Sequence, residues 1–191
     1  MKSIGFVATV ALTALVAACA TGGGGPGLGN LLEFRGPDVE GVLDTSYAET
    51  GKGGEWLFLN LMLSGTRRAD TTVTRSEVWL ITPDGRQVPM VDQEQFAQAY
   101  GELQGRLTQF SVASRPLEYY REDRAPCGRW FFSVPTSPAP AFDELYLNDR
   151  RYCEGLIAFE LPADVPSGSY RLVIEQGEQA LAVPFHLDVE E

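Results

Sequence analysis

Histidine chemistry in this chain is limited to one residue, because the sequence contains a single histidine, His186. A Ser-His-Asp site would need that imidazole as its general base. The apolar alternation of residues 181–187 predicts a strand that turns Leu181, Val183, Phe185 and Leu187 inward and His186 outward. We therefore expect His186 to be an exposed strand residue and not a catalytic base.

Carboxylates are the next candidates for chemistry. Asp143, Glu144, Asp149 and Glu154 crowd one stretch, which Arg150 and Arg151 interrupt. A pair of such groups can serve acid–base hydrolysis of a glycan, and a cluster of them can bind calcium. The stretch lacks the glycine and terminal glutamate spacing of an EF-hand. We expect a solvated acidic loop and no metal site.

Arginines and aromatic residues are interleaved in residues 115–130, which is unusual in an acidic chain. Tyr, Trp and Arg are the residues most enriched at binding hot spots, and arginine clamps carboxylates or stacks on rings. The alternative is that these arginines pair with nearby acids while the aromatic side chains fill the core. The candidate partner surface consists of Tyr119, Tyr120, Arg121, Arg124 and Arg129.

The elements that would position these residues are mostly strands. Residues 56–63 are apolar on both faces, which is typical of a central strand covered on both sides. A Pro-Asp-Gly turn at 83–85 predicts a hairpin between residues 77–81 and 86–90, with Pro89 at a sheet edge. Further strands are predicted at 129–134, 156–161, 170–174 and 181–187.

One segment follows a helical period instead. Phe96, Ala99, Tyr100 and Leu103 recur at i, i+3, i+4 and i+7, and Asp92 precedes them as a candidate cap. We predict a helix over residues 93–103 that docks on the sheet. The alternative is an inserted helix that forms a lid or a partner surface.

The N-terminus has the features of a secretory signal peptide: one basic residue, Lys2, an apolar run from Ile4, and small residues before Cys19. Residues 16–19, Val-Ala-Ala-Cys, resemble the lipobox of bacterial lipoproteins. The resemblance implies cleavage before Cys19 and acylation of Cys19 by fatty acid such as palmitate. It also implies an outer-membrane destination, with the domain facing the periplasm or, alternatively, the cell surface.

This N-terminus divides the chain into residues 1–18 as signal peptide, 19–30 as a lipidated Gly-rich tether and 31–191 as one domain. The alternatives are an ordinary signal peptide, or an uncleaved span, for which the apolar run is short. With Cys19 lipidated, Cys127 and Cys153 remain, and we expect them to form one disulfide in an oxidising compartment. The alternative is a redox or catalytic thiol, although the sequence has no C-x-x-C motif. Too few Cys and His residues are left for a zinc site.

The C-terminal third resembles the closing strands of bacterial immunoglobulin-like domains. Its apolar strand at 156–161 ends in Pro162, a Pro-Ser-Gly turn follows at 166–168, and a Tyr-x-Leu-x-Ile strand begins at Tyr170. The resemblance implies an all-β, immunoglobulin-like antiparallel β-sandwich with one short helical insertion. It transfers no catalytic residues.

The net charge of −11 makes the chain a poor candidate for nucleic acid. We therefore expect a lipid-anchored, non-catalytic binding or accessory module of the bacterial cell envelope, without a cofactor, whose partner is an envelope protein or a glycan. Two alternatives stay open: a carboxylate-dependent envelope hydrolase acting on glycan, and a carrier that holds a small ligand between its sheets.

Overall fold

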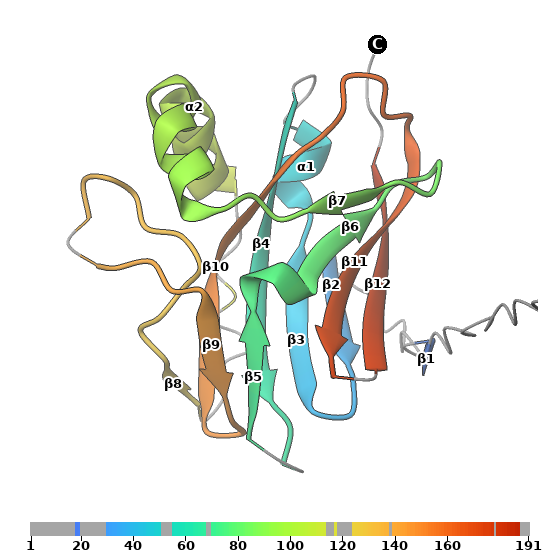
Figure 1. The fold of residues 1–191 in the computed structure, drawn as a ribbon, viewed down its shortest axis with the longest axis vertical. Helices are drawn as coiled ribbons and strands as arrows, with labels where there is room; N and C mark the ends of the chain where they lie inside the picture. The colour runs from blue at the N-terminus through green and yellow to red at the C-terminus, as the bar shows by residue number, and fades with distance from the viewer. Residues whose placement is uncertain are drawn as a thin grey trace, which may run out of the picture.

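The fold is an all-β sandwich with one long helix against it (Figure 1). The computed structural model describes residues 18–19, 30–50, 55–67, 70–113, 117, 124–137, 139–177 and 179–187. The predicted fold class is confirmed at the level of a β-sandwich. The predicted signal peptide, apart from its last residue, Ala18, and most of the tether lie outside the described residues.

Two five-stranded sheets form the sandwich. The first sheet has the order β1 (Ala18–Cys19), β12 (Gln179–Leu187), β11 (Gly168–Gln176), β6 (Val78–Ile81) and β7 (Gln87–Pro89). The second has the order β2 (Leu31–Arg35), β3 (Val39–Asp44), β4 (Trp56–Gly65), β10 (Arg151–Glu160) and β8 (Ala125–Pro126). A separate pair joins β5 (Thr71–Thr74) to β9 (Glu144–Leu147), and short helices α1 (Ser46–Thr50) and η1 (Arg75–Glu77) lie in the connections.

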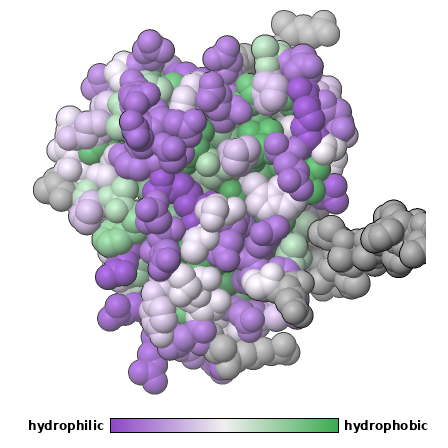
Figure 2. Space-filling model, viewed as in Figure 1, coloured by the Kyte–Doolittle hydropathy of each residue, from purple (hydrophilic) through white to green (hydrophobic). Residues whose placement is uncertain are grey.

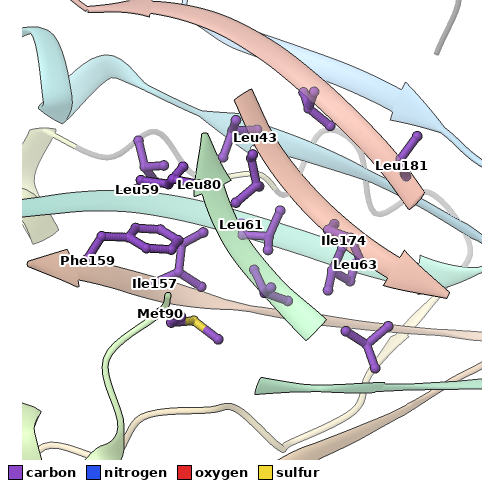
Figure 3. Close-up of a cluster of buried hydrophobic side chains, with 14 of the residues drawn as sticks. Leu43, Leu59, Leu61, Leu63, Leu80, Met90, Ile157, Phe159, Ile174 and Leu181 are labelled. Atoms are coloured by element: carbon purple, nitrogen blue, oxygen red, sulfur yellow. The ribbon is translucent and has the colours of Figure 1, made fainter. Parts of the chain in front are cut away.

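The core fills the space between the two sheets (Figure 3). β4 alternates so that Leu59, Leu61 and Leu63 meet Leu80 and Ile174 from the opposite sheet. The other face of β4 is also buried, since every residue from Leu57 to Gly65 is buried. The prediction of a central strand covered on both sides is therefore correct, and burial of both faces explains why its sequence shows no polar alternation.

Helix α2 (Gln93–Ala113) covers the outer face of the second sheet. Phe96, Leu103 and Phe110 of its apolar stripe are buried against Phe58 of β4 and Ala158 of β10. The prediction that the helix docks on the sheet is confirmed. The helix is longer than the predicted residues 93–103, because its apolar spacing continues through Phe110.

Two glycines on the exposed side of α2 allow a stability prediction. Alanine at Gly101 or Gly105 would meet no atom within 4 Å. Because glycine in a helix costs about 0.5–1 kcal/mol relative to alanine, we expect Gly101→Ala and Gly105→Ala each to raise the free energy of unfolding by that amount in urea titrations. The matched control is Gly85→Ala, where φ is +86° and the same methyl group should destabilise the protein.

The predicted hairpin is present, with β6 and β7 antiparallel and Trp79 opposite Pro89. β7 lies at the end of the first sheet, as Pro89 indicated. The chain then crosses between the sheets, because Met90 forms a bridge with Phe159 of β10 and the Val91 amide donates to the Ala158 carbonyl at 3.1 Å. This crossover places the start of α2 beside the second sheet.

The strand predicted over residues 129–134 is not formed. Phe131 is buried, but the backbone polar groups of this segment bind elsewhere. The Phe131 carbonyl accepts from the Arg75 side chain, and the Trp130 carbonyl accepts from the Phe142 amide at 2.9 Å. The apolar pattern of residues 129–134 therefore reports burial of a loop, whose carbonyls are satisfied without a strand ladder.

Tyr170 ties β11 to the turn before it. Its side chain is fully buried and stacks on Phe185, and its hydroxyl donates to the Pro166 carbonyl at 3.0 Å. Burial raises the pKa of Tyr170 to about 12. The Tyr170 hydroxyl therefore stays protonated at neutral pH, and it must be protonated to donate this hydrogen bond.

We expect Tyr170→Phe to lower the free energy of unfolding by about 1 kcal/mol, the typical value of one buried hydrogen bond. A folded-state pKa above the unfolded value of 10 means that the stabilising contribution is complete below pH 10 and declines as the pH rises through about 12. Urea titrations of the natural protein and of Tyr170→Phe, at pH 7 and above pH 10, measure the difference in their free energies of unfolding. An unchanged difference between the two proteins across that range would contradict the assignment.

Candidate functional site

The candidate site is an open groove of about 500 Å³ at one end of the β5–β9 pair. Three stretches of chain line it: residues 74–76 at the end of β5 and in η1, residues 89, 90 and 92 between β7 and α2, and residues 143–144 at the start of β9. The groove therefore combines segments that lie up to 70 positions apart in the sequence, from Thr74 to Glu144. The surrounding face is largely hydrophilic, with small scattered apolar areas (Figure 2).

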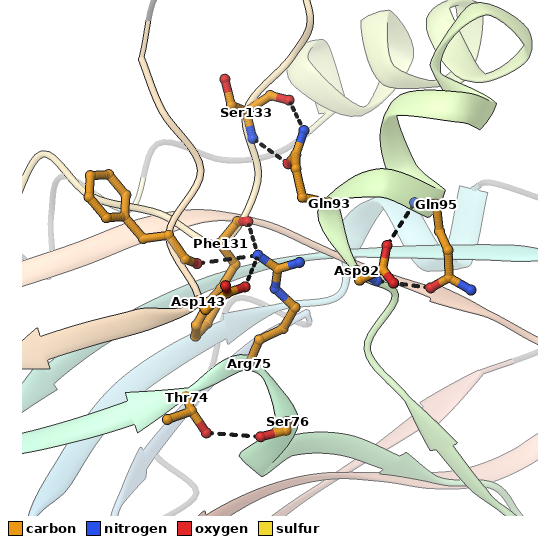
Figure 4. A network of polar contacts seen from close by, with 10 residues as sticks. Thr74, Arg75, Ser76, Asp92, Gln93, Gln95, Phe131, Ser133 and Asp143 are labelled. Carbon is orange, nitrogen blue, oxygen red and sulfur yellow. Dashed lines mark hydrogen bonds and ion pairs between the residues drawn. The ribbon is translucent and has the colours of Figure 1, made fainter.

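Arg75 is the central residue of the groove (Figure 4). Its side chain is only 9% exposed, and its Nη2 donates to the carbonyl oxygens of Phe131 at 2.9 Å and Phe142 at 3.4 Å. The same nitrogen pairs with Asp143 at 2.8 Å, and the guanidinium lies 5.4 Å from the ring centroid of Phe132. Arg75 therefore connects η1 to the loop that replaces the predicted strand.

The other nitrogens of Arg75 are less well satisfied. Nε is buried and has no hydrogen-bond partner, and the hydrogen bonds and ion pair of the side chain all use Nη2. In Figure 4 the remaining terminal nitrogen points toward the side on which Asp92 lies. A buried donor without an acceptor costs free energy, so the guanidinium presents unused donor capacity beside the groove.

The start of α2 forms a second wall. Asp92 accepts from the Gln95 amide at 2.7 Å, and the Asp92 amide donates to the Gln95 side chain at 3.0 Å. This reciprocal pair is a capping box, so the prediction of Asp92 as helix cap is correct. Gln93 exchanges two hydrogen bonds with the Ser133 backbone, at 2.8 and 2.9 Å. The helix and the loop therefore brace each other.

Only two of the four carboxylates in the predicted acidic stretch lie at the groove. Asp143 and Glu144 reach the groove, and both are exposed. Asp149 follows in the turn after β9, and Glu154 lies within β10. Among the described residues, no group of three or more His, Cys, Asp or Glu side chains is arranged to hold a metal ion.

The predicted partner surface is described only in part, because Tyr119, Tyr120 and Arg121 lie outside the described residues. Arg124 forms contacts within the protein, with the Ser64 hydroxyl and with the Glu40 carboxylate, which also pairs with Arg35 at 3.2 Å. Arg129 is exposed and stacks over Phe142 at 4.8 Å. The acid that pairs with Arg124 is therefore distant in sequence.

Cys127 and Cys153 form a disulfide, as the sequence predicted, with their Cα atoms 5.1 Å apart. Cys153 lies in β10, and Cys127 follows β8 at the start of the loop that carries Trp130 and Phe131. The bridge therefore fixes one end of the loop that supports Arg75. His186 is exposed on β12, as expected. No helix in the described ranges has the length and apolar character needed to span a membrane.

Sequence reasoning did not identify Arg75. Its partners, Phe131, Phe142 and Asp143, are 56 to 68 positions away, so no local spacing connects them. The only signal was a charged residue between two strand-like segments, which is equally typical of a turn. Asp92 was recognised as a cap, but its place on the groove depends on the crossover at Met90.

No family model matches the chain, and no curated protein or solved structure matches it. Its class therefore rests on fold and site: a disulfide-braced β-sandwich with an arginine-centred surface groove.

Proposed function

We propose that this protein is a lipid-anchored, non-catalytic binding module of the bacterial cell envelope, and that the groove around Arg75 is its binding site. The observation that carries the binding role is the guanidinium of Arg75: its Nη2 is held by two carbonyls and a carboxylate, whereas its Nε has no hydrogen-bond partner among the described residues. Such a fixed, incompletely satisfied side chain in an open groove favours recognition of a ligand.

The rigidity of the groove supports the same role. The disulfide, the Gln93–Ser133 bonds and the Arg75 contacts hold each wall before a ligand arrives. Preorganised walls lower the entropic cost of association. The lipobox-like residues Val16–Cys19 support the anchored location, and an immunoglobulin-like assignment is supported by Tyr170, whose bond to Pro166 is similar to the tyrosine corner of such domains.

The two alternatives have less support. Asp92, Asp143 and Glu144 line the groove, but Asp92 caps α2 and Asp143 pairs with Arg75. Glu144 alone has no such role, whereas glycan hydrolysis of this kind needs a pair of carboxylates. A carrier would need space between the sheets, and the buried side chains of both sheets pack together there.

Two measurements on the full chain test the proposal. Incorporation of labelled palmitate in a bacterial host should occur in the natural sequence and be lost in Cys19→Ala. A photo-crosslinking amino acid at exposed Ser76, in the groove, should capture a specific envelope partner, whereas the same group at exposed Glu33 on β2 should not. Absence of lipid label would reject the anchor, and absence of capture at Ser76 would reject the groove as binding site.

A further inference from the structure

We propose that the groove binds an extended basic segment of a partner protein, whose lysine or arginine side chains face Asp92 and Glu144 and whose backbone carbonyl accepts from Arg75. This inference rests on the proposed binding function and names the chemistry of the partner. It combines three independent features of the groove: its excess negative charge, its unused donors and its apolar strip.

The charge of the groove favours a cation. Three carboxylates, Asp92, Asp143 and Glu144, line it together with one guanidinium, which leaves an excess of two negative charges. Because Arg75 is paired with Asp143, no cationic side chain that lines the groove is left to pair with Asp92 or Glu144. Both side chains are exposed, and the chain as a whole carries −11. An anionic ligand would meet repulsion from these groups, whereas a basic segment is attracted over long range.

Arg75 adds a requirement that charge alone does not explain. Its contacts with the described residues use only Nη2, and the other terminal nitrogen points toward the side on which Asp92 lies (Figure 4). A simple cation has no acceptor to offer a guanidinium and would be repelled by it. A peptide carries a carbonyl at every residue, so one segment supplies both an acceptor for Arg75 and cationic side chains for the two carboxylates.

The third feature is an apolar strip between the charged groups. Pro89 and Met90 line the groove next to Asp92. Lysine and arginine have aliphatic stems that pack on apolar surface while the charged end reaches polar partners. A volume of about 500 Å³ falls within the range of ligand-sized sites, which suits a few residues of an extended chain.

The test uses the full chain in a nonionic detergent and fluorescence anisotropy. The probe is a fluorescein-labelled peptide of alternating lysine and glycine, and the comparison probe has glutamate in place of lysine. We expect binding of the lysine probe that weakens as salt is raised from 50 to 200 mM, and no binding of the glutamate probe. Equal binding of the two probes, or preference for the glutamate probe, would overturn the proposal.

Variants locate the binding on the groove. The double variant Asp92→Asn with Glu144→Gln removes both charges and keeps a capping residue at position 92; since each exposed pair is worth up to about 1 kcal/mol, we expect about tenfold weaker binding. The matched control is Glu33→Gln, an exposed carboxylate on β2, which should change the affinity less than twofold. Equal affinities of the double variant and the control would overturn the proposal.

Competition with spermine distinguishes recognition of a peptide from simple attraction of any polycation. Because spermine offers no acceptor to Arg75, it should displace the lysine probe only at concentrations well above those of the unlabelled peptide; equal potency would overturn the role of Arg75. Failure of the basic-segment proposal can be distinguished from failure of the proposed function. Crosslinking at Ser76 without binding of the lysine probe would reject the basic segment alone, whereas probe binding without lipid labelling would reject the anchor alone.

Discussion

Replacing Gly155 with alanine is expected to lower the free energy of unfolding by about 1–3 kcal/mol, the typical range for overpacking a filled site. A β-carbon at this position would lie 2.5 Å from Cδ1 and Nε1 of Trp130, closer than atoms can approach. The indole is packed against the core, and its Nε1 donates to the Leu156 carbonyl at 2.5 Å. The ring must move, losing this bond and part of its burial.

Urea unfolding measures the stability change, and tryptophan emission reports the ring. Displacement of Trp130 should shift the emission to longer wavelength, and Trp130→Phe assigns the contribution of this residue among the three tryptophans. The matched control is Gly101→Ala on α2, where the same methyl group meets open space and should stabilise the protein. A loss below about 0.5 kcal/mol for Gly155→Ala, with unchanged emission, would contradict the packing described for Trp130.

Removal of the disulfide is expected to have a comparable effect. The bridge closes a loop with a sequence separation of 26 residues, and chain-entropy arguments give about 3–4 kcal/mol for a loop of that size. The double variant Cys127→Ala with Cys153→Ala avoids placing a hydroxyl at buried position 153. Urea unfolding of this variant and of the natural pair, both in a Cys19→Ala background, isolates the contribution of the bridge.

The same variant should loosen the groove, because Cys127 begins the loop whose Phe131 and Phe142 carbonyls hold Arg75. Amide hydrogen exchange in residues 127–134 should therefore accelerate more than exchange in β4. Reduction of the natural protein with dithiothreitol is the control and should reproduce both effects. Equal stability of oxidised and reduced protein would contradict a bracing role for the disulfide.

Much of the fold could be predicted from local patterns. The β6–β7 hairpin follows from its Pro-Asp-Gly turn, α2 from the spacing of Phe96 to Leu103 and the cap at Asp92, and β12 from alternation around His186. In each case the signal lies within about a dozen residues, where turn chemistry and periodicity act directly. The strand wrongly predicted over residues 129–134 shows the limit, because burial of a loop gives the same apolar run.

The groove could not be predicted in this way. Asp143 and Glu144 belong to an acidic stretch of the sequence, but only the pairing of β9 with β5 brings them beside Arg75. Arg124 was expected near local acids, yet its partner is Glu40 on β3. These contacts depend on which strands are neighbours, and strand order is decided by burial over the whole chain.

The strand-rich class, the turns, the helix cap and the cysteine pair therefore follow from the sequence alone, because each depends on backbone preferences or on residue counts. The meeting of Arg75, the helix cap Asp92 and the first residues of β9 in one groove depends instead on how the whole chain packs. The two sheets must bury their apolar faces against each other, and this packing brings Arg75 beside residues that lie 56 to 68 positions away.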